Sequence, residues 1–280
     1  MIKKPINRTR KDIIVLGSGT SILELSEKDR EYINQCEVVI AINKFMAFYK
    51  KAKIMPTHIF YTDAYEWSVV LFLQHIFNVC RKNNLKNLTF VLGKKILKRP
   101  ITKQRLEENI FLYLLKKAYL KVKYELNQTD NLNLFLVPHN SYFEFVSHQN
   151  WINQNNSWSY SLDQPLFHYR GSLTTVLNYI SIKFPNRPIK LVGTDFYGSE
   201  YFFQQELNQL NINWEDWSTS ITQQEGKHFS AISYQGTTMF NKLDYIIDNL
   251  CQSGNDIYCC NHKSLLVTNG YIDYKPVSQK

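Results

Sequence analysis

The sequence lacks several short motifs that are typical of a particular chemistry. No D-x-D occurs among the 280 residues, so we do not expect a nucleoside diphosphate held through a bridging metal. No Gly-x-Ser-x-Gly elbow is present, which argues against a serine hydrolase of the α/β type. His, Cys and carboxylate residues nowhere take the spacing of a zinc site. We therefore expect no metal and no resident cofactor.

Cysteines and long apolar runs are also scarce. The five cysteines share no metal-ligand spacing, and we interpret all of them as reduced core residues of a cytoplasmic protein. They are Cys36, Cys80, Cys251, Cys259 and Cys260. The longest apolar run, 69–77, is too short and too polar to span a bilayer. The first residues lack the apolar segment of a signal peptide, so we expect no secretion signal.

The positive charge is concentrated in one stretch. The net charge is +9, and residues 94–123 hold ten basic and two acidic residues, a balance of +8. The basic residues are Lys94, Lys95, Lys98, Arg99, Lys103, Arg105, Lys116, Lys117, Lys121 and Lys123. Such a basic patch attracts polyanions, namely nucleic acid, anionic lipid or an acidic glycolipid. A solvated helix face is an equally good interpretation.

Apolar strands and amphipathic helices alternate along the chain. The expected strands are 12–16, 38–42, 58–61, 88–92, 132–137, 190–195 and 256–259. Expected helices are one that starts at a Ser26–Asp29 capping box, then 66–80, 174–184, 238–251 and a short one near Ser264. The alternation predicts an α/β fold with a mostly parallel sheet flanked by helices. We expect one domain over 1–280, with a small lid or insert at about 198–235, where periodicity is weak.

Polar residues follow three successive strands. A loop of two glycines and three hydroxyl residues ends the first strand, and its members are Gly17, Ser18, Gly19, Thr20 and Ser21. Asn43 ends the second strand, and Thr62 with Asp63 ends the third. Glycines let the backbone approach a ligand, and the hydroxyls and amides can bind an anion or a sugar. The loop matches neither the dinucleotide-binding fingerprint nor the Walker motif. We interpret this 17–21 loop as a candidate nucleotide site.

The stretch 170–197 has a helix followed by a short buried strand. Arg170 lies just before the helix, and Asp195 and Tyr197 lie just after the strand. Ligands sit outside the carboxyl ends of such strands, so all three could line one crevice. An equally good interpretation of Asp195 is a helix cap or a brace for a loop. Tyr197 and Tyr201 could donate hydrogen bonds to a leaving phosphate, or be two half-buried tyrosines.

Taken together, the 17–21 loop and the stretch 170–197 resemble the bacterial sialyltransferases that complete lipooligosaccharides with CMP-sialic acid. The resemblance covers most of the chain and is anchored at 16–21, 42–43, 60–62, 170–172, 193–197, 227–229 and 258–266. It implies a metal-independent, Rossmann-like nucleotide-binding domain of the GT-A-like kind, with a lid. The motif Gly-x-Asp-Phe-Tyr at 193–197 is its most specific part.

The resemblance also implies roles for single residues. The 17–21 loop, Asn43, Thr62 and Asp63 would bind the CMP donor, and Ser172 would approach the carboxylate of its sugar. Tyr197 and Tyr201 would hold the phosphate, and the segment 258–266, which includes Asn261 and Ser264, would contact the cytidine. His228 would be the catalytic base, and Asp195 and Arg170 are the other candidate catalytic residues. A histidine in the polar segment 226–230 is poorly explained by core packing, and its ordinary pKa near 6.5 suits proton transfer.

Some residues depart from that pattern and leave the donor sugar open. Thr62 stands where the family has Asn, and Leu173 where it has a small hydroxyl residue; the residues after Phe229 also differ. The chain is similar as well to the retaining transferases that use CMP-Kdo. In that interpretation Asp195 would be a covalent nucleophile.

Three hypotheses follow for the function. The first is a glycosyltransferase that moves sialic acid or Kdo from CMP to a glycan or glycolipid acceptor, lipooligosaccharide or capsule. It would be cytoplasmic and peripheral at the anionic inner face of the bacterial inner membrane, and it could form a homo-oligomer. The second is a non-catalytic nucleotide- or sugar-binding module. The third is a nucleic-acid binder that uses the basic patch; we favour the first and expect no nucleic-acid partner.

Overall fold

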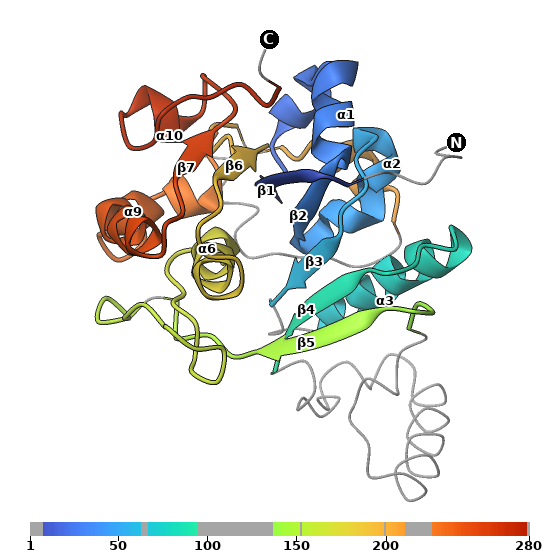
Figure 1. Cartoon of the computed structure of the whole chain (residues 1–280), viewed down its shortest axis with the longest axis horizontal. Coiled ribbons are helices and arrows are strands. Elements are labelled where there is room, and N and C mark those ends of the chain that lie inside the picture. The colour runs from blue at the N-terminus through green and yellow to red at the C-terminus, as the bar shows by residue number, and fades with distance from the viewer. Residues whose placement is uncertain are drawn as a thin grey trace, which may run out of the picture.

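The computed structural model describes residues 8–62, 67–94, 137–151, 153–198, 200–210 and 226–278. Within these ranges the chain forms a sheet whose six strand pairings are all parallel, with the order β5-β4-β3-β2-β1-β6-β7 (Figure 1). The strands are β1 Arg10–Leu16, β2 Cys36–Ile42, β3 His58–Tyr61, β4 Thr89–Gly93, β5 Tyr142–Val146, β6 Ile189–Val192 and β7 Ile257–Cys259. The predicted α/β, Rossmann-like fold with a mostly parallel sheet is confirmed.

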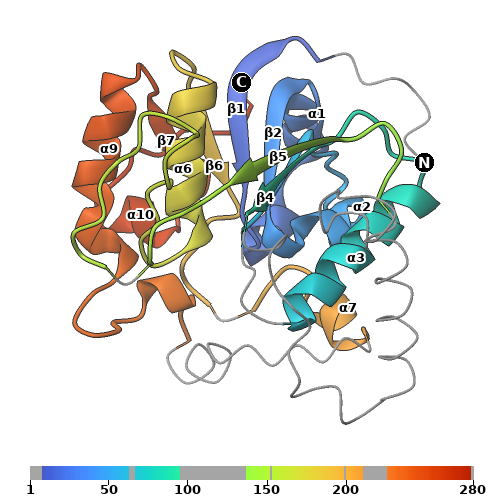
Figure 2. The same cartoon turned by 90° about the horizontal axis from the view of Figure 1, so that it is seen from below.

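Helices cover both faces of the sheet because successive residues of each strand point to opposite sides. Ile14 and Leu16 of β1 face a core shared with α1, α2 and α3, whereas Ile13 and Val15 face a core shared with α6 and α9. The helices are α1 Glu27–Asn34, α2 Tyr49–Ala52, α3 Trp67–Lys82, α6 Ser172–Lys183, α7 Gln204–Asn208, α9 Leu243–Gln252 and α10 Leu265–Thr268. Short 3-10 turns are η1 Thr20–Glu24, η2 Asn43–Phe48, η5 Phe229–Ala231 and η6 Met239–Lys242. Figure 2 shows α6 and α9 on one side of the sheet and α2 and α3 on the other.

The direction of winding reverses at β1. The chain continues from β1 to β2, β3, β4 and β5 on one side, then returns through α6 to add β6 and β7 on the other side. The carboxyl ends of β2, β1, β6 and β7 are therefore neighbours on one edge of the sheet, and α6 begins at the same edge. This is the topological switch point, where open α/β sheets bind their ligands.

The predicted capping box at the start of α1 is confirmed. The Ser26 hydroxyl accepts a hydrogen bond from the Asp29 amide at 3.1 Å, and the Asp29 carboxylate accepts one from the Ser26 amide at 3.2 Å. Two otherwise unpaired amides of the first turn are thus satisfied, which fixes the helix start.

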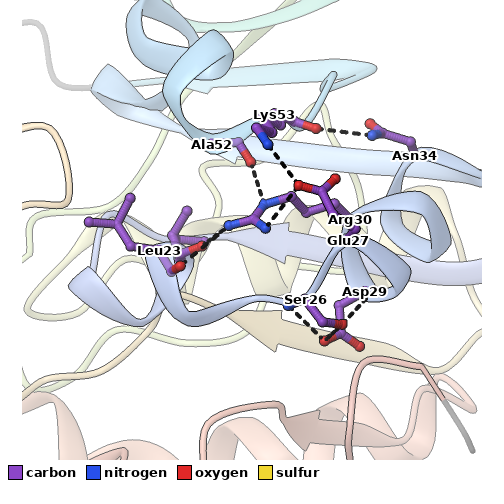
Figure 3. A network of polar contacts seen from close by, with 9 residues as sticks. Leu23, Ser26, Glu27, Asp29, Arg30, Asn34, Ala52 and Lys53 are labelled. Carbon is purple, nitrogen blue, oxygen red and sulfur yellow. Dashed lines mark hydrogen bonds and ion pairs between the residues drawn. The ribbon is translucent and has the colours of Figure 1, made fainter.

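Arg30 of α1 ties that helix to the turn that follows the 17–21 loop. Its Nε donates to the Ala52 carbonyl at 3.1 Å, and Nη2 lies 3.4 Å from the carbonyls of Ile22 and Leu23 (Figure 3). The side chain is mostly buried, so these contacts also satisfy a charged group removed from water. Helix α1 therefore holds in place the turn that directly follows the 17–21 loop, which is the candidate nucleotide site.

One predicted strand ends earlier than expected, and another lies mostly outside the described residues. The strand that pairs with β4 is β5, Tyr142–Val146, whereas most of the expected strand 132–137 lies outside the described residues. β5 is an edge strand that is mostly half-exposed and carries Glu144, so its sequence lacks a buried apolar run. The expected strand 190–195 ends earlier, at Val192, because Gly193 takes φ +70° and turns the chain away from the sheet.

The cysteine prediction is right in part. Cys36, Cys80 and Cys259 are buried free thiols and Cys260 is half-buried. Cys259 faces the α6 side of the sheet and Cys260 the opposite side, as strand alternation requires. Cys251 is exposed near the end of α9, so the interpretation as a core residue is wrong for this position.

The segment predicted as a lid is described at its two ends. At the first end Phe202 and Phe203 are buried, and Phe203 stacks on Phe48 of η2 with ring centroids 4.2 Å apart. At the second end Lys227 forms an antiparallel bridge with Tyr197. Residues 211–225 lie outside the described part, as does the basic patch beyond Lys94. Within the described ranges, no helix is long and apolar enough to cross a membrane.

Candidate active site at the switch point

Asp195 is the centre of a buried polar network at the carboxyl ends of β1 and β6. Its side chain is 2% exposed and accepts three hydrogen bonds. The Ser21 amide donates to Oδ2 at 3.0 Å, the Ser21 hydroxyl to Oδ1 at 2.5 Å, and Asn261 Nδ2 to Oδ1 at 2.8 Å. Three donors around a carboxylate compensate its removal from water. Asp195 thus ties the 17–21 loop to the segments that follow β6 and β7.

The glycines of the 17–21 loop are explained by the same close packing. A Cβ on Gly17 would lie 2.3 Å from the Gly193 carbonyl oxygen, and one on Gly19 would lie 2.2 Å from Asp195 Oδ2. Neither position accepts a side chain without moving backbone or a buried carboxylate. The two glycines let the loop lie directly against the end of β6.

Tyr197 and Asn261 extend this network toward the surface. Asn261 Nδ2 donates to the Tyr197 hydroxyl at 3.0 Å as well as to Asp195, so one amide joins both predicted site residues. Burial raises the pKa of the Tyr197 phenol, although the bond from Asn261 acts in the opposite direction. Tyr197 therefore stays protonated at neutral pH and keeps its O–H as a donor for an anion.

The Ser264 hydroxyl is already occupied by a hydrogen bond within the protein. It is fully buried, its hydroxyl donates to the Thr194 carbonyl at 2.7 Å, and its side chain caps the short helix α10. In this geometry Ser264 holds the segment after β7 against the end of β6. A direct contact of this hydroxyl with cytidine would require that bond to open.

Asn43 and Ser172 form a second polar pair at the same edge of the sheet. Asn43 follows β2 with φ +50°, and its Nδ2 donates to the Ser172 hydroxyl at 3.2 Å. Ser172 is the first residue of α6, whose N-terminus carries partial positive charge that favours an anion. The sequence brings these two residues together across 129 positions, as expected for residues of one site.

Thr62 and Tyr201 lie at the margins of this arrangement. Thr62 is fully buried at the end of β3, and its Oγ1 has no hydrogen-bond partner in the part of the chain that is described. Asp63 lies outside the described residues. Tyr201 is half-buried; its ring stacks on Phe203 at 5.2 Å, and the Lys44 ammonium lies 5.4 Å from its centroid. The next amide, that of Phe202, donates to the Ser18 carbonyl at 3.0 Å, which places this segment over the 17–21 loop.

Arg170 and His228 make a third group of contacts, separate from the Asp195 network and from the Asn43–Ser172 pair. Arg170 is 1% exposed, and its Nη2 donates to the Ile232 carbonyl at 2.7 Å. His228 is half-buried, its ring meets Phe196 edge-on at 5.6 Å, and its amide donates to the Phe196 carbonyl at 3.3 Å. The bridge between Tyr197 and Lys227 therefore brings His228 beside the end of β6, although Val192 lies 36 positions earlier in the sequence.

Sequence reasoning missed three groups near these residues. Lys44 is 7% exposed at the switch-point edge, and Trp151 and Tyr234 lie against the Arg170 guanidinium. A lysine directly after a strand-ending Asn was a usable signal for a buried cation. No local signal marks Trp151 or Tyr234, because their common partner is distant in sequence. Among the residues described, no group of three His, Cys, Asp or Glu side chains could hold a metal ion.

Chemically, this edge of the sheet offers neutral donors, one buried carboxylate and one lysine. The donors are amides, hydroxyls and a phenol, namely Ser21, Asn43, Ser172, Tyr197 and Asn261. Lys44, which directly follows Asn43, adds positive charge. Such groups can hold an anionic ligand and stabilise the negative charge that develops on a leaving phosphate.

The comparisons with known proteins give distant likenesses. No protein-family model matches the sequence, and no curated protein is significantly similar to it. The sialyltransferase CstII from Campylobacter jejuni, in complex with the substrate analogue CMP-3FNeuAc, matches 97% of this chain and 90% of its own, with 14% identity and a TM-score of 0.45. The monofunctional alpha-2,3-sialyltransferase Cst-I of the same organism matches 99% and 85%, with 15% identity and a TM-score of 0.41. The MAf glycosyltransferase from Magnetospirillum magneticum AMB-1 matches 91% of this chain and 32% of its own, with 12% identity and a TM-score of 0.42. Scores of this size assign the chain to no family.

Proposed function

We propose that this protein transfers an ulosonic acid, sialic acid or Kdo, from a CMP-activated donor to a glycan acceptor of the cell surface. The observation that carries the proposal is the gathering of polar side chains from four adjacent strand ends at the switch point. Asn43 follows β2, the 17–21 loop follows β1, Asp195 and Tyr197 follow β6, and Asn261 follows β7. The Gly-x-Asp-Phe-Tyr motif at 193–197 supports a CMP-linked donor.

The chemistry of such a donor suits the groups at this edge. Its anomeric carbon loses CMP readily through an oxocarbenium-like state, so the protein has to position the acceptor, take its proton and stabilise CMP. The acceptor oxygen bonds to the anomeric carbon, the bond from that carbon to the phosphate oxygen breaks, and CMP leaves. In the proposed arrangement the 17–21 loop and Asn43 hold CMP, and the Tyr197 phenol donates to its phosphate.

The proton of the acceptor is assigned to His228 in an inverting reaction. At rest the His228 Nδ1 accepts a hydrogen bond from the Ser230 amide at 3.3 Å, which orients the ring. As a base, Nδ1 has to release this weak bond and take the acceptor proton. In a retaining reaction Asp195 instead bonds to the anomeric carbon, after loss of its contacts with Ser21 and Asn261, while the bond from that carbon to the phosphate oxygen breaks and the Nε2–H of His228 donates to the phosphate. The acceptor oxygen then displaces Asp195 from the carbon and gives its proton to the CMP phosphate. The resting bonds of Asp195 are shorter and more numerous, so we favour inversion.

The proposal includes the place where the protein acts. The basic patch 94–123 would dock on the anionic inner face of the bacterial inner membrane, where lipooligosaccharide or capsule precursors are presented. A homo-oligomer is compatible with this placement. The alternative of another class, a module that binds nucleotide or sugar without catalysis, uses the same edge of the sheet and differs only in turnover.

Ligand binding gives the first test. We expect CMP to raise the melting temperature without added metal, and EDTA to leave that shift unchanged. At a hundred times the dissociation constant, a ligand adds about 2.7 kcal/mol to the free energy of unfolding, which is easily measured. Stabilisation by UDP with manganese, but not by CMP, would contradict the donor assignment. Slow hydrolysis of a CMP-sugar by the purified protein would distinguish an enzyme from a binding module.

A further inference from the structure

Arg170 combines two features that are individually uncommon. It is a fully buried arginine, with 1% of its surface exposed, and its backbone takes φ +59°, in the left-handed region that residues other than glycine rarely adopt. Backbone strain of this kind persists only where the surrounding structure enforces it, and it concentrates at functional sites. The next residue, Gly171, caps α6.

Three aromatic rings surround the Arg170 guanidinium. Its Cζ lies 5.2 Å from the Trp151 ring centroid, 4.9 Å from that of Phe229 and 5.2 Å from that of Tyr234. Trp151 also contacts the other two rings, with centroids 5.9 Å from Phe229 and 5.5 Å from Tyr234. We call these three residues the aromatic cage. Each ring attracts the cation through its negative face.

The hydrogen bonding of Arg170 is incomplete. Nη2 donates to the Ile232 carbonyl, but Nε and Nη1 are buried and have no hydrogen-bond partner in the structure as described. No carboxylate within the described ranges forms an ion pair with it. An unpaired buried charge destabilises a fold, and the three rings offset this only in part. The contacts of Arg170 therefore need an explanation other than stability.

The cage connects three segments that are far apart in sequence. Trp151 belongs to the loop after β5, Arg170 precedes α6, and Phe229 and Tyr234 flank the Ile232 carbonyl in the segment after residue 226. The Arg170 amide also donates to the Trp151 carbonyl at 3.1 Å. His228 is covalently next to Phe229, so whatever fixes Phe229 also limits where the His228 imidazole can lie.

We propose that Arg170 is a positioning residue, which clamps the segment 228–234 through the aromatic cage and so sets the place of His228 beside the end of β6. The role of His228 rests on the proposed function, whereas the clamp itself does not. Because Arg170 is 1% exposed and its guanidinium packs against three rings and the Ile232 carbonyl, it acts through this segment and not by direct contact with the donor. Rings and one carbonyl hold it, so the planar fork of arginine matters as well as its charge.

The test compares three variants with the wild type. Arg170→Met keeps an unbranched apolar stem and removes the guanidinium with its charge, and Arg170→Lys keeps the charge but loses the planar fork. Arg187→Met is the matched control, because Arg187 also donates to a carbonyl, that of Lys11, and lies 6.0 Å from a ring, that of Phe184. Arg187 precedes β6, at the opposite edge of the sheet.

Hydrogen–deuterium exchange of the full-length protein is the first measurement. In Arg170→Met we expect the amides of 228–234 to exchange at least tenfold faster, with smaller acceleration in Arg170→Lys and none in the control. Amides of β4, which none of these arginines contacts in the described structure, should be unchanged in all variants, which reports that the fold is intact. Equal exchange of 228–234 in wild type and in Arg170→Met, with β4 intact, overturns the clamp.

Kinetics with a CMP-sugar is the second measurement. We expect kcat of Arg170→Met to fall about 10²-fold while KM for the donor changes less than threefold, since a base contributes 10² to 10⁴. A large rise in KM at unchanged kcat would overturn the positioning role and indicate direct donor binding. If the wild type turns over no CMP-sugar, the proposed function fails, and the exchange result still supports or overturns the clamp by itself.

Discussion

The substitution Asp195→Asn separates a bracing role of this carboxylate from a nucleophilic one. Asp195 accepts hydrogen bonds from the Ser21 amide, the Ser21 hydroxyl and Asn261. An amide keeps one acceptor oxygen but places an N–H₂ donor where the second oxygen was. At least one buried donor then loses its acceptor, and the remaining bonds lose their charge. We therefore expect a clear loss of stability if Asp195 is a brace.

The magnitude follows from the burial and the number of bonds. One orphaned buried donor costs about 1–3 kcal/mol, and hydrogen bonds to a charged group contribute about 1.5–3 kcal/mol each, so a total near 3 kcal/mol is expected. For a chain of this size, 1 kcal/mol lowers the melting temperature by about 2–4 °C. Asp195→Asn should thus melt about 6–12 °C lower than the wild type. Asp163→Asn, in an exposed loop, is the matched control and should change stability by less than about 0.5 kcal/mol.

The assay combines thermal melting with activity well below the melting point. If Asp195 is a brace, Asp195→Asn recovers kcat to within about tenfold of the wild type at low temperature, where most molecules are folded. Intact-mass spectrometry of enzyme with donor alone should then show no glycosyl adduct. An unchanged melting temperature, with activity lost at every temperature, would refute the bracing argument and support a covalent nucleophile.

Three further predictions follow from other residues. His228→Ala should lower kcat by about 10² to 10⁴, and NMR of the wild-type product should show inverted anomeric configuration; retention would exclude His228 as the base of a single displacement. Burial lowers the pKa of His58 to about 4, so between pH 6.5 and 4 this side chain stays neutral in the folded chain but is protonated in the unfolded chain. This contribution to the free energy of unfolding is present above pH 6.5 and is lost as the pH falls toward 4, by about 3 kcal/mol. In urea titrations at several pH values, the free energy of unfolding of His58→Gln should therefore depend less on pH between 6.5 and 4 than that of the wild type. Reversal of four charges in the basic patch should weaken binding to anionic vesicles and leave activity on a soluble acceptor intact. The four residues are Lys94, Lys95, Lys98 and Arg99.

Much of the fold could be predicted because central parallel strands are continuous apolar runs. β2 and β3 are buried on both faces, and their runs were identified nearly to the residue. β5 was missed because its position at the edge of the sheet leaves Glu144 and its neighbours half-exposed. Glu144 accepts hydrogen bonds from Tyr179 and Lys183 of α6, a tertiary reason for a charge in a strand.

The candidate site was predictable where its residues end strands. The 17–21 loop, Asn43 and Asp195 follow apolar runs directly, so position alone indicated a shared edge. The structure adds the partners that no local pattern indicates. Trp151 and Tyr234 contact each other and both pack against Arg170, and the Arg170 bond to Ile232 spans 62 positions.

The position of β1 in the middle of the sheet has a consequence for synthesis of the chain. β1 pairs with β2 almost at once, but its other neighbour, β6, begins at Ile189. While the ribosome makes the intervening residues, one edge of β1 has open amides and carbonyls, the kind of surface that recruits strands from other chains. The bond between Ser21 and Asp195 spans 174 positions and can form only after that edge is closed. The contact of the 17–21 loop with Asp195 is therefore absent until residue 195 has been made, and nascent chains that end before residue 189 should need a chaperone to stay unaggregated.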